Sequence, residues 1–312
     1  MGDLVSVIIP AYNVGQYLRQ TIGSVQAQSG PRWELVVVDD GSTDDTPQIL
    51  REMADGDPRI RVLRQDNAGS AAARNTGLDH ARGKYVTFLD GDDFWTPDFL
   101  SSLLEALRRS GKRLAYCGYR HIYGNGYSRR YRYGYPGGRI VVPYLRGKVQ
   151  IHIGAIMVET EVFRRHDIRF TPGCLIGQDQ EVVMRLLAVE EAAPLPRELL
   201  YYRVRAGSAI TSSWKWEKHL HAILSFRRGA QFILHHASEE ERGALQREIE
   251  GRLAQKQYKF LWRMVKRGAV AEAARLLRED FVEMERLEKG RLGLVDRVKY
   301  FLLMRRIGDA PR

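Results

Sequence analysis

The chain has 312 residues, of which 44% are hydrophobic and 28% charged, and its formal net charge is +11. This composition is ordinary for a folded protein and does not indicate intrinsic disorder. No stretch approaches the roughly 20 consecutive apolar residues of a membrane-spanning helix. The N-terminus lacks the ordered basic, apolar and small-residue zones of a secretory signal, so none is expected. The positive charge favours an anionic partner such as nucleic acid, a phospholipid surface or a phosphorylated substrate, although a basic surface without a partner would give the same charge.

Four short apolar runs predict buried strands, at residues 5–9, 35–38, 60–63 and 85–89. The segments between and after them have helical features. These are the stripe Leu18, Ile22 and Val25, a capping stretch at 42–45 before Ile49 and Leu50, an alanine-rich segment at 69–81 closed by Gly83, and a Thr96-Pro97-Asp98 start before Leu100, Leu103, Leu104 and Leu107. Strict alternation of strand and helix predicts parallel strands joined by right-handed crossovers.

The next hundred residues differ in character. Tyrosine- and arginine-rich stretches at 119–123 and 129–133 flank Gly124-Asn125-Gly126, which predicts a hairpin or a loop. A strand is expected at 151–158, a helix beginning near Asp179, and a further strand at 199–205.

From Trp214 the pattern is helical, with interruptions expected at Gly268 and Gly290. The predicted organisation is therefore an α/β part at 1–115, a part of different character at 116–212 and a basic helical region at 213–312. Cys117 and Cys174 lie far apart without metal-ligand spacing, so reduced thiols in a cytoplasmic protein are expected.

Polar side chains follow two of the predicted strands at the edge where open α/β sheets bind ligands. Tyr12 follows the first strand, and Asp90, Asp92 and Asp93 follow the fourth. An aromatic face suits a nucleobase, and clustered carboxylates suit a divalent cation that holds a diphosphate. The sequence therefore predicts an enzyme that binds a nucleoside diphosphate.

Four motifs, in this order, carry a resemblance to a known family. They are Val-Ser-Val-Ile-Ile-Pro-Ala-Tyr-Asn at 5–13, Val-Val-Asp-Asp-Gly-Ser-Thr-Asp at 37–44, Asn67-Ala68-Gly69 with Ala-Arg-Asn-Thr-Gly at 73–77, and Leu-Asp-Gly-Asp-Asp at 89–93. Together they resemble family 2 glycosyltransferases, which are inverting enzymes of the GT-A fold. The resemblance is close over the first 115 residues, looser to 211, and absent beyond. It implies a Rossmann-like nucleotide-sugar-binding half at 1–115 with a mostly parallel sheet and an acceptor-binding half at 116–212. These are followed here by an α-helical extension at 213–312.

The resemblance also implies residue roles. The nucleotide would be bound by Pro10, Ala11, Tyr12, Asp39, Asp40, Asn67, Arg74, Asp90, Gly91 and Arg205. Mn²⁺ or Mg²⁺ would be bound by Asp92 and Asp90, which two positions apart on a strand end would point the same way. The metal would neutralise the diphosphate as it leaves. Asp39 could alternatively cap the following helix, and Arg74 could lie on a solvated helix face.

Asp179, in the segment 176–181, matches the family's catalytic base. Alternatively, Asp179 could simply cap a helix, and Glu181 would be the second candidate for the base. Two positions depart from the family pattern. Gln178 replaces a glutamate, which suggests altered acceptor contacts, and Arg205 stands where a histidine is common, which places any metal ligand beyond the aspartates in doubt. A Gln-X-X-Arg-Trp segment is absent, which favours a single addition over polymer synthesis.

The expected partners are a nucleotide-sugar donor, most simply a UDP-sugar, and an acceptor that is a saccharide or a lipid-linked saccharide of bacterial surface polysaccharide or glycolipid assembly. The basic 119–135 segment suits a phosphate-bearing acceptor equally well as a solvated hairpin. Residues 214–312 hold 22 Lys or Arg against 14 Asp or Glu. A helix with Val295, Val298 and Leu302 on one face could lie on the inner surface of the cytoplasmic membrane, or dock on the catalytic part or on a second subunit of a homodimer.

Three other classes compete with a transferase. A sugar nucleotidyltransferase would need a glycine-rich loop with a lysine after the first strand, which residues 10–13 do not supply. Nucleic-acid binding does not explain three clustered carboxylates, so no nucleic acid is expected. A non-catalytic nucleotide-sugar-binding relative, or a basic protein that binds an anionic polymer or membrane, is the remaining alternative, and Asp179 argues against it.

Overall fold

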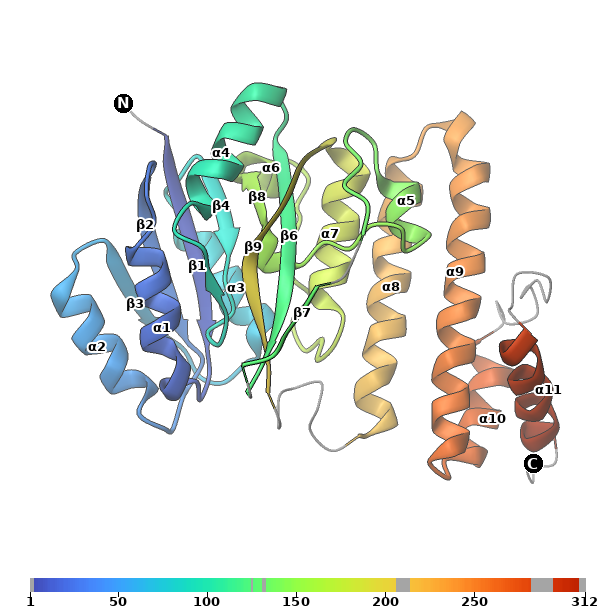
Figure 1. The fold of residues 1–312 in the computed structure, drawn as a ribbon. Helices are drawn as coiled ribbons and strands as arrows, with labels where there is room; N and C mark the ends of the chain where they lie inside the picture. The colour runs from blue at the N-terminus through green and yellow to red at the C-terminus, as the bar shows by residue number, and fades with distance from the viewer. Residues whose placement is uncertain (1–2, 125, 131–132, 206–213, 282–293, 309–312) are drawn as a thin grey trace. The chain divides into compact units, whose positions relative to one another are not determined.

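The computed structural model describes residues 3–124, 126–130, 133–205, 214–281 and 294–308 (Figure 1). The chain forms two compact units, 1–213 and 214–312, which are described separately. The subdivision of the first unit after residue 115 stays a prediction, and it falls inside strand β6.

The four strands predicted in the first 90 residues are present and parallel. They are β1 (Leu4–Ala11), β2 (Arg32–Asp39), β3 (Ile60–Arg64) and β4 (Tyr85–Phe88). β1 pairs with β2 and β4, and β2 pairs with β3. Alternate residues of β2 contribute to cores on the two faces of the sheet, and β1 is buried on both of its faces. This is why the strands read as apolar runs.

The predicted helices are present as α1 (Gly15–Gln26), α2 (Thr46–Gly56), α3 (Ser70–His80) and α4 (Phe99–Ser110). The apolar stripes predicted for α1 and α4 are buried. Several predicted helix ends are wrong. The Ser42 hydroxyl accepts the Asn13 N–H instead of capping α2, α3 ends at His80 before Gly83, and Pro97 precedes the N-cap of α4. Gly83 is required for packing, because a Cβ there would lie 2.6 Å from the Ser6 nitrogen.

The remaining strands extend the sheet with mixed orientation. They are β5 (Phe94–Trp95), β6 (Leu114–Tyr123), β7 (Ser128–Arg130), β8 (Ile156–Glu159) and β9 (Ala192–Val204). The strand order is β3-β2-β1-β4-β8-β6-β9-β5, with β7 paired to β6 as the predicted hairpin. β6 and β9 are parallel, whereas β8 is antiparallel to both neighbours. The architecture is the expected α/β fold.

Three further helices complete this unit, α5 (Val141–Leu145), α6 (Thr160–Arg165) and α7 (Gln178–Val189). The strand predicted at 151–158 is wrong in its first half, because η1 (Ile153–Ala155) is a 3₁₀ turn there. Cys117 and Cys174 are buried free thiols.

The second unit contains α8 (Trp216–His236), α9 (Glu239–Lys266), α10 (Val270–Glu279) and α11 (Leu294–Gly308). Gly268 separates α9 from α10 with a φ of +87°, as predicted, while Gly290 lies outside the described residues. The stripe predicted for α11 is only partly testable, because the Val295 and Val298 side chains are not among those described. Leu302 is 42% exposed and Leu303 is buried instead. None of the described helices is long and apolar enough to cross a bilayer.

Candidate active site

The carboxyl ends of four adjacent parallel strands bring the predicted motifs into one row. Ala11, Asp39 and Arg64 are register partners at the ends of β1, β2 and β3, and β4 ends beside β1. The residues that follow these strands therefore share one edge of the sheet, as the sequence predicts.

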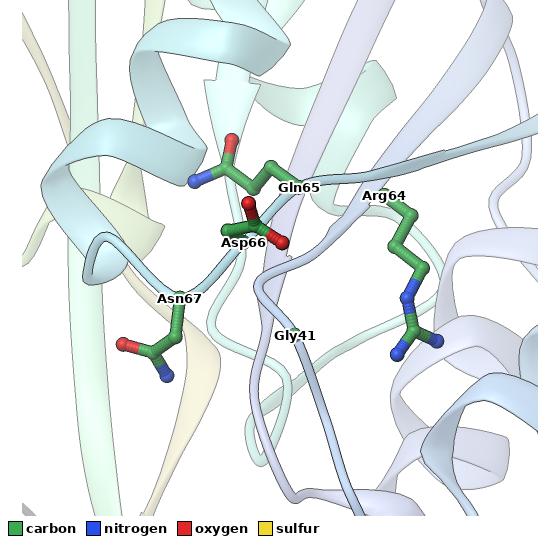
Figure 2. A pocket seen from close by; sticks show the side chains of 5 residues that line it. All are labelled: Gly41, Arg64, Gln65, Asp66 and Asn67. Atoms are coloured by element: carbon green, nitrogen blue, oxygen red, sulfur yellow. The ribbon is translucent and has the colours of Figure 1, made fainter.

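A pocket of about 580 Å³ opens at the β2–β3 end of this row (Figure 2). Gly41, Arg64, Gln65, Asp66 and Asn67 line it, so the predicted nucleotide residue Asn67 faces a cavity. The pocket is lined by side chains that offer amide, carboxylate and guanidinium groups, which suits a polar ligand.

Asp39 and Asp40 are both buried next to this pocket and hold its loops. Asp39 accepts the Ser42 N–H at 2.9 Å and forms an ion pair with Arg64 at 3.1 Å. Asp40 accepts the backbone N–H groups of Ala68 and Gly69 and the side chain of Gln65, at 2.7 to 2.9 Å. The two carboxylates thus hold residues of the pocket wall, and their nucleotide contacts stay a prediction.

The end of β1 presents the predicted aromatic ring. Pro10 and Ala11 are buried in the strand, whereas Tyr12 is 48% exposed beyond it. Gly91 packs against this strand end, since a Cβ there would lie 3.2 Å from the Pro10 carbonyl oxygen. A side chain at position 91 would therefore be in tight contact with the end of β1 and with Val14.

Three aspartates lie in a turn after β4, and each has a different partner. Asp90 accepts from Arg74 Nη2 at 2.5 Å, and Asp92 accepts from Arg205 Nε at 2.5 Å. Asp93 accepts the Arg203 N–H at 2.8 Å. The strand geometry expected for Asp90 and Asp92 is wrong, because β4 ends at Phe88 and the Asp93 N–H closes a turn onto the Asp90 carbonyl.

The turn therefore joins Asp93, rather than Asp92, to Asp90. One ligand atom each from Asp90, Asp93 and His152 lies within 4.8 Å of the others. Asp93 Oδ2 is buried and has no hydrogen-bond partner in the described part of the chain. Burial raises the pKa of Asp93 well above its usual value, and the charges of Asp90 and Asp92 raise it further. A cation would relieve both costs, so the two carboxylates fit a divalent metal.

His152 fits a metal only if its ring gives up the hydrogen bond that it accepts from the Gly154 N–H. Its Nδ1 accepts the Gly154 N–H at 3.1 Å, so the proton of the neutral ring is on Nε2. Ligation through Nε2 would require that proton to move to Nδ1 and the bond to Gly154 to break. The sequence analysis missed His152, although a single polar residue between Ile151 and Ile153 in an apolar run is a usable signal.

Arg74 connects this cluster to the predicted base. The side chain is only 3% exposed, and its Nη1 lies 2.9 Å from Asp179 Oδ1 while its Nη2 contacts Asp90. Burial would lower the pKa of Arg74, but Asp179 and Asp90 raise it above its ordinary value. The alternative of a solvated arginine on a helix face is therefore wrong.

Asp179 lies in the first turn of α7, and burial raises its pKa from 3.8 to about 6, with Arg74 opposing and Asp90 adding to the shift. A carboxylate with that pKa is ionised at neutral pH and is a stronger base than an ordinary aspartate. The helix has no side-chain cap, so the simple cap alternative is not what the structure shows. Glu181 is fully buried and accepts from Thr171 at 2.8 Å and from Arg185, which places the fallback base in the core.

The residue before Asp179 is also buried. Gln178 donates to the Ser70 hydroxyl at 2.6 Å, and its Oε1 has no hydrogen-bond partner among the described residues. Gln178, which stands where the family commonly has a glutamate, therefore links the start of α7 to the start of α3.

A group of four rings, here called the aromatic face, adjoins the carboxylates. Tyr119, His121, His152 and Tyr202 form a closed cycle with ring centroids 5.0 to 5.6 Å apart. All four are half-buried. Burial raises the pKa of Tyr202, and the charges of Asp93, Asp90 and Asp92 add to this shift, so the phenol lies near the acidic cluster.

The basic residues of the hairpin behave differently from the rings. Arg120 and Arg130 both contact Glu198, at 2.9 and 3.2 Å. These two arginines are therefore engaged within the protein, and the rings are the part of this segment that is linked to the candidate site.

The sequence matches the family described as Glycosyl transferase family 2 over residues 6–182. It is 32% identical over 239 residues to glycosyltransferase GlyA of Streptococcus pneumoniae serotype 4, covering 72% of this chain and 34% of that protein. It is 45% identical over 117 residues to the putative teichuronic acid biosynthesis glycosyltransferase TuaG of Bacillus subtilis, covering 37% of this chain and 46% of TuaG. The chain thus spans a third to a half of these relatives.

Solved structures share the fold. S. aureus TarS 1–349 in complex with UDP-GlcNAc has a TM-score of 0.63 at 18% identity, covering 99% of this chain and 93% of that one. Mannosyltransferase PcManGT from Pyrobaculum calidifontis, in complex with GDP-Man and Mn²⁺, has a TM-score of 0.56 at 19% identity, covering 99% and 88%.

Proposed function

Because the chain belongs to glycosyl transferase family 2, we propose that it transfers a sugar from a nucleotide-diphosphate donor to an acceptor hydroxyl, with inversion at the anomeric carbon. The observation that carries this proposal is the buried Arg74, which contacts the base candidate Asp179 and the carboxylate Asp90 with one guanidinium group. This arrangement holds a proton acceptor at a fixed place beside a candidate diphosphate site.

The donor is a UDP-sugar in this proposal. Tyr12 would stack on the base, and the pocket lined by Asn67 would receive its polar edge. TarS binds UDP-GlcNAc whereas PcManGT binds GDP-Man, so the fold accommodates either base. The carboxylates Asp39 and Asp40 favour a ring N–H donor such as that of uracil.

Asp90 and Asp93 would hold Mn²⁺ or Mg²⁺, with Asp92 and His152 beside them. The ion would neutralise the negative charge of the leaving diphosphate. Nitrogen ligation by His152 favours Mn²⁺ over Mg²⁺, which prefers oxygen ligands.

In the reaction, Asp179 takes the proton of the acceptor hydroxyl as its oxygen forms a bond to the anomeric carbon. The bond from that carbon to the diphosphate breaks on the opposite face, and its electron pair leaves with the nucleotide. Arg74 keeps Asp179 oriented and ionised while it offsets the charge of Asp90. A non-catalytic relative would not need Asp179 or its ion pair with Arg74.

The acceptor in this proposal is a saccharide, because the aromatic face offers rings to the apolar face of a pyranose beside the carboxylates. The engagement of Arg120 and Arg130 by Glu198 weighs against a phosphate grip there. A single addition within surface polysaccharide or glycolipid assembly, at the cytoplasmic side of the membrane, is the expected context.

The testing experiment is calorimetric titration of UDP, GDP and dTDP with and without Mn²⁺, followed by a transfer assay, on the parent and on Asp179→Asn. We expect Mn²⁺-dependent UDP binding in both proteins and transfer only in the parent. A well-folded parent that binds no nucleotide would overturn the proposal, and transfer by Asp179→Asn at the parent rate would overturn the base assignment.

A further inference from the structure

The second unit contains a pocket that the candidate active site does not use. It has a volume of about 520 Å³ and is lined by side chains of α9 and α11. Two of its lining residues are aromatic and none is acidic. The other five, here called the basic pocket residues, are Lys259, Arg263, Lys266, Arg267 and Lys299.

The positions on α9 place the charges side by side. Lys259, Arg263 and Arg267 follow one another at i, i+4 and i+8, so they share a helix face on which like charges repel. Residues 251–271 hold six Lys or Arg and no Asp or Glu. The sequence therefore concentrates positive charge in this stretch without an acidic side chain inside it.

A favourable interaction with the helix dipole explains only part of this pattern. Cations are stabilised in the last turn of a helix, and α9 ends at Lys266 with Arg263 in that turn. Lys259 lies about two turns before the end, and Lys299 comes from a different helix. Their presence in the same pocket needs another reason.

Three of the five basic pocket residues have no acidic partner in the part of the chain that the structure describes. Lys259, Arg263 and Lys266 form no ion pair with any acid among the described residues. Burial lowers the pKa of Lys256 to about 8, and the charges of Arg252 and Lys259 contribute to this shift. Burial also lowers the pKa of His219, with Arg263 among the charges that add to the shift.

We propose that this pocket binds the phosphoryl group of an anionic ligand, supplied by a phospholipid headgroup or by a soluble phosphate. Clustered Lys and Arg side chains provide multiple charge-assisted donors for phosphate oxygens. Half-buried Trp262 in the pocket lining provides an amphipathic ring of the kind found at headgroup depth. The proposal concerns the second unit alone and does not depend on the transferase function.

The test compares the full-length parent with Arg263→Gln/Lys266→Gln and with a matched control, Arg242→Gln/Arg247→Gln. The control changes two exposed arginines of the same helix outside the pocket and removes the same charge. Co-sedimentation with phosphatidylglycerol vesicles and with phosphatidylcholine vesicles tests the lipid source. Calorimetry with inorganic phosphate tests the soluble source. Because the two double variants have identical nucleotide sites, a difference in phosphate binding between them can be assigned to the pocket.

If the ligand is a lipid, the parent should bind phosphatidylglycerol vesicles but not phosphatidylcholine vesicles. Binding to phosphatidylglycerol should weaken about 25-fold in the pocket variant, because each basic residue near an anionic surface contributes roughly a factor of five to the affinity. A soluble source predicts phosphate binding that only the pocket variant loses. Equal losses in the pocket and control variants, or no binding to either probe, would overturn the proposal. If the pocket variant fails to fold, Lys299→Gln on α11 replaces it, with an expected loss of about fivefold.

Discussion

Arg74 Nη1 lies 2.9 Å from Asp179 Oδ1, and this ion pair links α3 to α7, the helix that carries the proposed base. The residues are 105 positions apart in the sequence, and the arginine is almost inaccessible to solvent. The ion pair therefore couples the charge state of the base to the packing of the core.

Replacement of this arginine should cost stability. Arg74→Gln leaves Asp90 and Asp179 without their buried cation, and we expect a loss of about 3 kcal/mol or more in the free energy of unfolding. Urea denaturation measures it. The matched control is Arg197→Gln, whose ion pair with Asp98 joins side chains that are 51% and 39% exposed, and which should cost less than about 1 kcal/mol. Similar losses in both variants would show that the Arg74 cluster is not energetically distinct.

Transfer should depend on pH with an acid limb near 6. The pKa of Asp179 is raised to about 6, and the base is active when deprotonated, so the rate should rise with pH through 6 and reach a plateau above it. The measurement is kcat/KM from pH 5 to 8 at saturating Mn²⁺. Nucleotide affinity over the same range is the control, because a parallel change in binding would assign the limb to the metal ligands instead.

Metal affinity should depend on Asp93. Asp93→Asn removes a carboxylate whose Oδ2 has no other described partner, and we expect Mn²⁺ binding to weaken at least about tenfold. Electron paramagnetic resonance of free Mn²⁺ reports this without turnover. Asp98→Asn, the same change at a surface ion pair with Arg197, should leave the affinity unchanged. Unaltered binding in Asp93→Asn with loss in Asp92→Asn would restore the pair expected from the sequence.

The aromatic face should act on the acceptor alone. Tyr119→Ala removes one ring of the four, and we expect the KM for a saccharide acceptor to rise roughly five- to tenfold, since a ring contact is worth about 1 kcal/mol. Donor affinity should not change. Tyr127→Ala, at an exposed position of the hairpin, is the comparison variant and should have a smaller effect. A fall in donor affinity with unchanged acceptor KM would contradict this role.

The sequence predicts the first four strands and helices because each is short, periodic and bounded by residues with a local signal. It does not predict that ligand atoms of Asp93 and Asp90 lie within 4.8 Å of each other, because that depends on where β4 ends and on the turn that follows. His152 and Tyr202 are missed for a different reason. Their proximity to the carboxylates arises from the pairing of β6 with β8 and β9, which no local pattern in the sequence specifies.

The contacts of Arg203 affect the order in which the protein folds. Its backbone N–H binds Asp93, its Nε binds the Asp92 carbonyl, and its Nη2 binds Gln20. The acidic turn therefore gains its final shape only after a strand 110 residues further along the chain has docked. Closure of so long a loop is entropically costly and slow. During synthesis, the N-terminal half would leave the ribosome before the three aspartates of this turn could be fixed, and a fragment ending near residue 115 would lack the contacts from Arg203.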